Sequence, residues 1–215
     1  MKKVISYSLW GDKPKYTIGA IKNAELANNI YPGWISRFYI GNTVPNNIVD
    51  IISSIPNTEL IFMDSENNWK AMFWRFTSCY DETVDISIFR DTDSRLSMRE
   101  KYAVDEWLKS NKTFHIMRDH PYHRYPMLGG MWGYKKNNAY DIKTLLNNFN
   151  TIDSYGTDYQ FFIEKLYPLI GNDKVVHDEF FDKKPFPKPR ENKEFVGDVF
   201  DENNIRHLEY QKFIQ

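Results

Sequence analysis

The sequence contains very little cysteine, since Cys79 is the only one among its 215 residues. One cysteine excludes an internal disulfide and a zinc cluster built from cysteines, and it is typical of a reducing compartment. We therefore expect a cytoplasmic protein.

The chain also has no excess of either charge. Its 28 Lys and Arg residues face 29 Asp and Glu residues, which gives a formal net charge of -1 at pH 7. Proteins that bind a nucleic-acid backbone or an anionic membrane as their main partner carry basic patches or runs, and no long Lys/Arg run is present here. We expect no nucleic-acid partner.

Long hydrophobic runs are missing as well. The apolar stretch near the start, VISYSLW, is interrupted by Ser6 and Ser8 and ends at Gly11 and Asp12. It is too short for the apolar part of a signal peptide or for a membrane span, so we expect no transmembrane segment. Neither GxGxxG nor GxxxxGK[ST] occurs, so the sequence does not support a Rossmann dinucleotide-binding protein or a P-loop nucleotide-binding protein.

The chain is rich in apolar and aromatic residues, with 41% hydrophobic and 16% aromatic residues. A chain of this length can bury one sufficient core. Short β-branched or aromatic runs alternate with segments of helical spacing, which predicts βαβ units, a largely parallel sheet and one α/β domain spanning residues 1–215. The predicted strands are 4–10, 36–40, 59–63, 84–89, 113–117 and 174–176, and the predicted helices are 16–29, 46–54, 69–79, 97–110, 141–149 and 158–167.

The composition changes at residue 182, where DKKPFPKPRENKEF brings three prolines and few aliphatic residues. Proline cannot extend a helix or a central strand. We predict that residues 182–215 form an extended strap across the core, with disorder from about residue 183 as the alternative.

An acidic pair, Asp91 and Asp93, directly follows the predicted strand 84–89. Ligands of open α/β sheets bind at the carboxyl ends of strands, and two nearby carboxylates suit a hard divalent cation that bridges phosphate oxygens. The alternative is that these residues only begin a turn or cap the next helix.

A second cluster, FHIMRDHPYHRYPMLGGMWG, contains three of the five histidines, the acid Asp119, the pair Gly129 and Gly130, and Trp132. The histidines lack the spacing of a zinc site, and hydrogen-bonded loop histidines are the simpler interpretation. The glycines permit a backbone to approach a ligand closely, and Trp132 offers a flat face to a sugar ring. The alternative is that the glycines form only a tight turn and that Trp132 only packs in the hydrophobic core.

Other candidates lie apart in the sequence. His177 ends the last predicted strand, where imidazole can join carboxylates around Mn²⁺, and Lys183 or Lys184 can neutralise a diphosphate. Arg75, on the helix before the acidic pair, is a candidate for binding phosphate or sugar, and Asp158 lies at a helix start, where it could be a catalytic group or only a cap.

Taken in this order, the motifs resemble nucleotide-sugar-dependent glycosyltransferases of the GT-A fold. The order is VISYSLWGD, WKAMFWRF, a strand ending in DTD, LGGMWG, GTDYQ and VVHDEFFDKKPF. It is similar to that of retaining galactosyl- and glucosyltransferases with a late His-x-x-x-x-x-Lys-Pro-Trp element, and to small glycosyltransferase domains of large DNA viruses and bacterial polysaccharide loci. The resemblance covers about residues 4–186, and it departs from the pattern at Phe186, which stands in place of tryptophan. It implies a single-domain, Rossmann-like fold whose mixed, mainly parallel central sheet is flanked by helices.

The resemblance also implies roles for single residues. Asp91, Asp93 and His177 would bind Mn²⁺ or Mg²⁺, and Lys184 or Lys183 would contact the diphosphate. Arg75 would face the phosphates or the donor sugar. Gly130 and Trp132, with their neighbours from Gly129 on, would line the sugar pocket.

The expected activity is metal-dependent transfer of a hexose from a nucleotide diphosphate sugar, with UDP as the expected nucleotide, to a carbohydrate acceptor. The resemblance favours retention of configuration, whereas an inverting enzyme needs a carboxylate that deprotonates the acceptor, for which Asp119 and Asp158 are candidates. A non-catalytic carbohydrate-binding module and a metal-dependent phosphohydrolase are the alternatives. The phosphohydrolase is disfavoured because only Asp12 follows the first strand.

Overall fold

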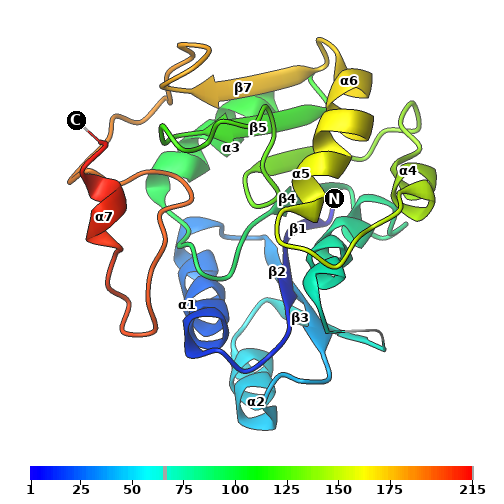
Figure 1. Cartoon of the computed structure of the whole chain (residues 1–215), viewed down its shortest axis with the longest axis vertical. Coiled ribbons are helices and arrows are strands. Elements are labelled where there is room, and N and C mark those ends of the chain that lie inside the picture. The colour runs from blue at the N-terminus through cyan, green and yellow to red at the C-terminus, as the bar shows by residue number, and fades with distance from the viewer. Residues whose placement is uncertain (65–66, 215) are drawn as a thin grey trace.

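The computed structural model of the chain describes residues 1–64 and 67–214. Within these residues seven strands form one sheet in the order β3-β2-β1-β4-β6-β5-β7 (Figure 1). Neighbouring strands are parallel except β6, which runs antiparallel to both β4 and β5. The strands are β1 Lys3–Leu9, β2 Ile35–Gly41, β3 Thr58–Met63, β4 Ile86–Phe89, β5 Phe114–Arg118, β6 Trp132–Lys135 and β7 Lys174–Asp178. The predicted α/β fold with a mixed, mainly parallel sheet is confirmed.

Helices cover both faces of this sheet. The core on one face joins β1 and β2 to α1, α2 and α3, and the core on the other joins β4, β5 and β6 to η1, α4, α5 and η2. The helices are α1 Pro14–Ile30, α2 Asn46–Ser54, η1 Trp69–Cys79 (a 3-10 helix), α3 Met98–Lys109, α4 Ile142–Asn148, α5 Thr157–Phe161, η2 Phe162–Leu166 (a π-helix), α6 Tyr167–Ile170 and α7 Leu208–Gln211. In the described part of the chain, no helix combines the length and the apolar character that crossing a membrane requires.

The alternation of β1 explains why serines interrupt its apolar sequence. Ile5, Tyr7 and Leu9 point into the core on the α1 face. Successive side chains of a strand point to opposite faces, so Ser6 and Ser8 point toward η1. Their hydroxyl groups donate to backbone carbonyls of η1, at 2.7 Å for Ser6 and 3.3 Å for Ser8. The serines therefore fix the backbone of η1 against the sheet.

The strand β6 differs from the sequence-based prediction. The sequence predicts no strand over residues 132–135 and places Trp132 in the glycine-rich segment LGGMWG instead, because a strand of four residues that contains glycine gives almost no periodic signal. Gly133 is needed there for packing, since a Cβ at this position would lie 3.0 Å from the ring of Trp107.

After β7 the chain folds back over the body of the molecule in turns, isolated bridges and α7. Figure 1 shows this segment, in orange and red, running from β7 toward the side of the molecule where α1 lies. Single β-bridges join Ser94 to Val199 and Asp178 to Lys184. We call residues 182–214 the strap.

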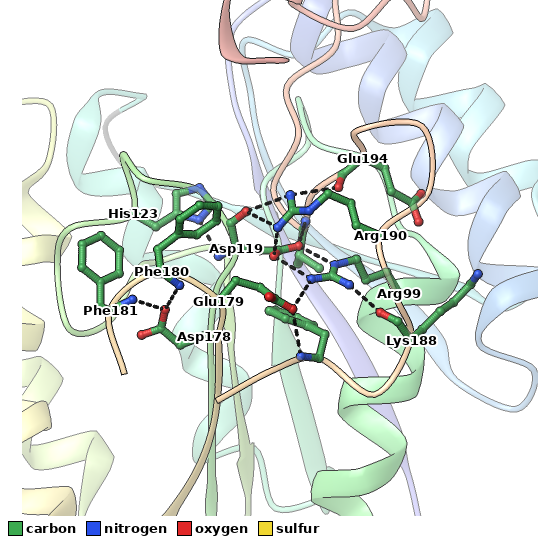
Figure 2. Close-up of polar contacts among 12 residues, drawn as sticks. Arg99, Asp119, His123, Asp178, Glu179, Phe180, Phe181, Lys188, Arg190 and Glu194 are labelled. Atoms are coloured by element: carbon green, nitrogen blue, oxygen red, sulfur yellow. Dashed lines mark hydrogen bonds and ion pairs between the residues drawn. The ribbon is translucent and has the colours of Figure 1, made fainter. Parts of the chain in front are cut away.

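A buried carboxylate connects the strap to the core (Figure 2). Asp119, which follows β5, is fully buried and accepts hydrogen bonds from Nε of Arg99 on α3 at 2.7 Å and from Nη2 of Arg190 on the strap at 2.8 Å. The backbone N–H of Val196, also on the strap, donates to the same carboxylate at 2.9 Å. Arg99 further pairs with Glu179 at 2.8 Å. One carboxylate therefore joins β5, α3 and the strap.

This arrangement predicts that Asp119→Ala destabilises the fold strongly. The substitution leaves the guanidinium groups of Arg99 and Arg190 without their main acceptor in a buried site, and breaking such a pair costs about 3 to 5 kcal/mol. Asp105→Ala, which removes an ion pair with Lys101 at the surface of α3, is the matched control and should cost less than about 1 kcal/mol. Urea unfolding measures both, and equal losses would contradict the anchoring role of Asp119.

Candidate active site

A cavity of about 580 Å³ opens where β1 and β4 end. Residues that follow β1, from Trp10 to Lys13, and those that follow β4, from Asp91 to Asp93, line it. The strap adds Phe195, Val199 and Tyr210 to the wall. The position and the volume are those of a ligand site in an open α/β sheet.

Arg75 joins two carboxylates in this cavity. Its side chain is buried, with the residue only 4% exposed. One guanidinium nitrogen, Nη1, donates to the carboxylate of Asp91 and to the backbone carbonyl of Arg90, and Nη2 lies 3.7 Å from Oδ2 of Asp158. The structure therefore brings together three residues that the sequence identified separately.

Two glycines allow this close approach. A Cβ at Gly130 would lie 2.0 Å from Oδ2 of Asp91, and a Cβ at Gly129 would lie 2.1 Å from Oδ2 of Asp158. Both glycines line the cavity, and the structure gives a reason for them: any side chain would displace a carboxylate.

Asp93 has a cationic partner of its own. Nζ of Lys15, in the first turn of α1, lies 2.9 Å from Oδ2 of Asp93. Burial, followed by the charge of Asp91, raises the pKa of Asp93, and Lys15 opposes that rise. Lys15 is not among the candidates predicted from the sequence, although its position five residues after Trp10, at the end of the first strand, was an available signal.

Asp158 lies in the first turn of α5 and is almost fully buried. Burial raises its pKa to about 6; the charge of Asp91 adds to the rise, and Arg75 opposes it. Its carboxylate therefore gains and loses its proton close to neutral pH, which suits a group that acts on a substrate.

The donor set of the cavity fits a hard divalent cation. Asp91 and Asp93 both line it, and Mg²⁺ in proteins is commonly held by one or two carboxylates together with substrate phosphates and water. Across residues 1–64 and 67–214, no group of three or more His, Cys, Asp and Glu side chains has the arrangement of a metal site. The protein would thus supply two ligands, Asp91 and Asp93.

His177 is not the third ligand that the resemblance implied. It lies on β7, and strands β5 and β6 separate β7 from β4, so about three strand spacings, roughly 14 Å, lie between them. His177 is buried, with Nδ1 at 2.8 Å from Nε2 of His115 and Nε2 at 3.4 Å from Glu106 on α3. It is absent from the cavity lining. The strand order, which the sequence did not indicate, is the reason for the error.

Lys183 and Lys184 also lie outside the cavity. The backbone of Lys184 exchanges two hydrogen bonds with that of Asp178, at 2.6 and 2.7 Å, so this turn belongs to the edge of the sheet beside β7. Among the described residues that line the cavity, the basic side chains come instead from Lys13 and Arg75, with Lys15 against Asp93.

Two further expectations are corrected by burial. Trp132 was expected in a sugar pocket, but the structure buries it completely and stacks it on Phe89 with ring centroids 4.0 Å apart. As part of β6 it faces the core instead of the cavity. Asp119 was a candidate base, but its carboxylate is fully buried and engaged by Arg99, Arg190 and Val196, so it has no access to a substrate.

Most of the aromatic residues that line the cavity are also absent from the candidates predicted from the sequence. Trp69 makes edge contacts with Trp10 and with Tyr155, at centroid distances of 6.3 and 5.3 Å. No periodic pattern marks these residues, because they come from loops, helix ends and the strap. The other aromatic and imidazole residues of the wall are Tyr16, His120, Tyr122, His123, Tyr159, Phe195 and Tyr210.

No model of a known protein family matches the sequence, and no curated protein does. Solved structures do match the fold. A glycosyltransferase involved in the glycosylation of the major capsid of PBCV-1 matches with a TM-score of 0.54 at 15% identity, over 83% of this chain and 82% of that one. Glucosyl-3-phosphoglycerate synthase from Mycobacterium tuberculosis, in complex with Mn²⁺, UDP and phosphoglyceric acid, matches with a TM-score of 0.52 at 11% identity, over 81% and 67%.

A third match is an enzyme of another kind. The 4-diphosphocytidyl-2C-methyl-D-erythritol synthase from Anaerococcus prevotii matches with a TM-score of 0.55 at 10% identity, over 88% of this chain and 93% of that one. The chain therefore has the fold of GT-A glycosyltransferases, as the sequence resemblance implied, and this synthase has a similar fold.

The ion pair between Lys15 and Asp93 predicts that Lys15→Met binds Mn²⁺ more tightly than the unchanged protein when no nucleotide is present. The lysine competes with a cation for Asp93, and removing an ion pair of this kind should raise the affinity about two- to fivefold. Titration calorimetry with MnCl₂ measures the effect. Lys22→Met, which removes a surface ion pair with Glu25 from the same helix, is the control, and equal affinities for both variants would contradict the prediction.

Proposed function

We propose that this chain is a metal-dependent glycosyltransferase that moves a hexose from a nucleotide diphosphate sugar, with UDP as the nucleotide, to a carbohydrate acceptor. One observation carries the proposal: Asp91 and Asp93 line a single cavity at the end of β4, together with Arg75. The fold supports it, since a synthase of similar fold is known in complex with UDP and Mn²⁺.

The residues of the cavity have distinct tasks in this reaction. Asp91 and Asp93 would hold the cation, which supplies positive charge to the leaving diphosphate. Arg75 and Lys13 add fixed positive charge beside it, and such preorganised charge favours the transition state because negative charge accumulates there. A cation held by Asp93 would replace the ammonium group of Lys15 as the partner of this carboxylate, and Lys15 would then be available to the phosphates.

The aromatic wall suits the nucleoside. Trp10 and Trp69 both line the cavity close to the loop that follows β1. A nucleobase stacked on an aromatic face gains about 1 to 3 kcal/mol.

Asp158 is the remaining carboxylate of the cavity. We propose that transfer retains the anomeric configuration of the donor sugar, which the resemblance favours. In that case Asp158 binds hydroxyl groups of the donor sugar. If transfer inverted the configuration instead, Asp158 would be the base that deprotonates the acceptor. Proton NMR of the first-formed linkage distinguishes the two courses, because an α-linked product from an α-linked donor requires retention.

Nucleotidyl transfer is the second candidate function, because the synthase from Anaerococcus prevotii has a similar fold. It would consume a nucleoside triphosphate and release pyrophosphate, whereas glycosyl transfer releases a nucleoside diphosphate. Release of UDP from UDP-glucose, measured beside release of pyrophosphate from CTP and UTP, separates the two.

The acidic pair predicts metal-dependent binding of UDP. Calorimetry should show binding in MnCl₂ that weakens at least tenfold in EDTA, because without the cation nothing bridges the diphosphate to the carboxylates of Asp91 and Asp93. The double substitution Asp91→Asn and Asp93→Asn should remove the response to Mn²⁺. Asp105→Asn, on the outer surface of α3, is the control. Equal affinity for UDP with and without metal would refute the metal bridge.

The raised pKa of Asp158 predicts how activity depends on pH. Burial raises this pKa to about 6, so the carboxylate is protonated below that pH and can no longer accept hydrogen bonds from sugar hydroxyl groups. We expect kcat/KM for release of UDP from UDP-glucose to fall about tenfold per pH unit below 6 and to level off above it. Asp158→Asn should lower the plateau and abolish this pH step.

Asp198→Asn is the control for this profile. The pKa of Asp198 is also raised to about 6 by burial, but its carboxylate accepts from Gln211 on the strap and does not line the cavity. The variant should keep the step at pH 6. A step that survives in Asp158→Asn and disappears in Asp198→Asn would assign the titration to the strap.

A further inference from the structure

A second hollow, of about 400 Å³, lies directly beside the main cavity. The two share the lining residues Tyr155, Gly156 and Tyr159, so they are adjacent. The other residues that line the second hollow are Tyr125, Gln160, Ile163 and Glu164. None of these four takes part in the proposed donor site.

Three tyrosines give this hollow an aromatic surface. The rings of Tyr125 and Tyr159 stack with centroids 4.5 Å apart and an interplanar angle of 25°. Tyr155 meets Tyr159 edge-on at 6.4 Å and is 71% exposed. The rings of Tyr125 and Tyr159 therefore pack against each other in the absence of a ligand. We call Tyr125, Tyr155 and Tyr159 the tyrosine shelf.

One side of the hollow is polar. Nε2 of Gln160 donates to Oε1 of Glu164 at 2.8 Å, which leaves the amide oxygen of Gln160 and the second carboxylate oxygen of Glu164 as acceptors. Both residues are exposed. The chain changes there from α5 to the π-helix η2, and π turns occur frequently at functional sites.

We propose that the tyrosine shelf binds a sugar ring of a neutral oligosaccharide that serves as the acceptor. This inference rests on the proposed glycosyl transfer, which needs a second substrate next to the donor, and the shared residues Tyr155 and Tyr159 provide that adjacency. Asp158, between them in sequence, faces the main cavity beside Arg75.

The chemistry of the shelf selects this class of ligand. Aromatic faces pack against the C–H faces of sugar rings, and Tyr supplies such area with little loss of conformational entropy. Gln160 and Glu164 offer acceptors to hydroxyl groups at the edge of a ring. Among the described residues that line the hollow, the charged side chain is the acid Glu164, so an anionic glycan would be repelled.

Saturation-transfer NMR tests the shelf with defined probes. The protein, saturated with UDP and MnCl₂, is offered cellobiose, maltose, lactose and N,N′-diacetylchitobiose, with octyl β-D-glucoside as a fifth probe. We expect transfer to ring protons of at least one disaccharide and a fall of at least fivefold in Tyr125→Ala. Gln160→Ala changes only an exposed side chain and should also weaken the signal. It therefore tests the same hollow even if Tyr125→Ala fails to fold.

Tyr102→Ala is the matched control, because Tyr102 is an exposed tyrosine on α3 outside both hollows and its loss should leave the signal unchanged. Transfer to none of the disaccharides, equal transfer in Tyr125→Ala, or transfer confined to the alkyl chain of octyl glucoside would each overturn the proposal. Binding of UDP by the same samples reports on the donor site separately. If the unchanged protein does not bind UDP, the result counts against the proposed function. If it binds UDP but none of the disaccharides, the result counts against the tyrosine shelf alone.

Discussion

The cavity depends on one buried guanidinium, that of Arg75. It contacts the carboxylate of Asp91 and lies 3.7 Å from that of Asp158, so a single positive charge holds two acidic groups in one wall. Its backbone is fixed to the sheet, because Ser6 donates to its carbonyl and its own N–H donates to Ser8. The two serines of β1, which looked like interruptions of an apolar strand, thus place the central charge of the site.

The outer wall depends on a second buried charge cluster, in which Asp119 ties the strap to α3 and β5. Figure 2 shows Arg99 and Arg190 converging on this carboxylate from two different segments. The strap in turn supplies Phe195, Val199 and Tyr210 to the cavity. The shape of the site is therefore coupled to the stability of the last part of the chain, as in enzymes whose binding walls come from docked loops on a rigid scaffold.

Local patterns in the sequence were sufficient for most of the fold and for part of the site. Helix α2 matches its predicted bounds, and Asp91, Arg75 and Asp158, which the sequence identified as separate candidates, lie in contact in the structure. The predictions that were wrong depend on how distant parts of the chain are arranged in space. The position of His177 depends on strand order, and the role of Trp132 on a four-residue antiparallel strand that has no periodic signal. The stacking of Tyr125 on Tyr159 joins distant segments, which no local pattern encodes. The ion pair between Lys15 and Asp93 also joins distant segments, and only the position of Lys15 just after the first strand pointed to it.

The most direct measurement is a crystal structure of the protein soaked with UDP and MnCl₂, with diffraction collected at the manganese absorption edge. We expect one anomalous peak within coordination distance of carboxylate oxygens from both Asp91 and Asp93, bridged to the diphosphate, with the uracil against the wall of Trp10 and Trp69. UDP bound elsewhere, or bound in this cavity while the anomalous peak lies away from both aspartates, would contradict the metal-dependent nucleotide-sugar site.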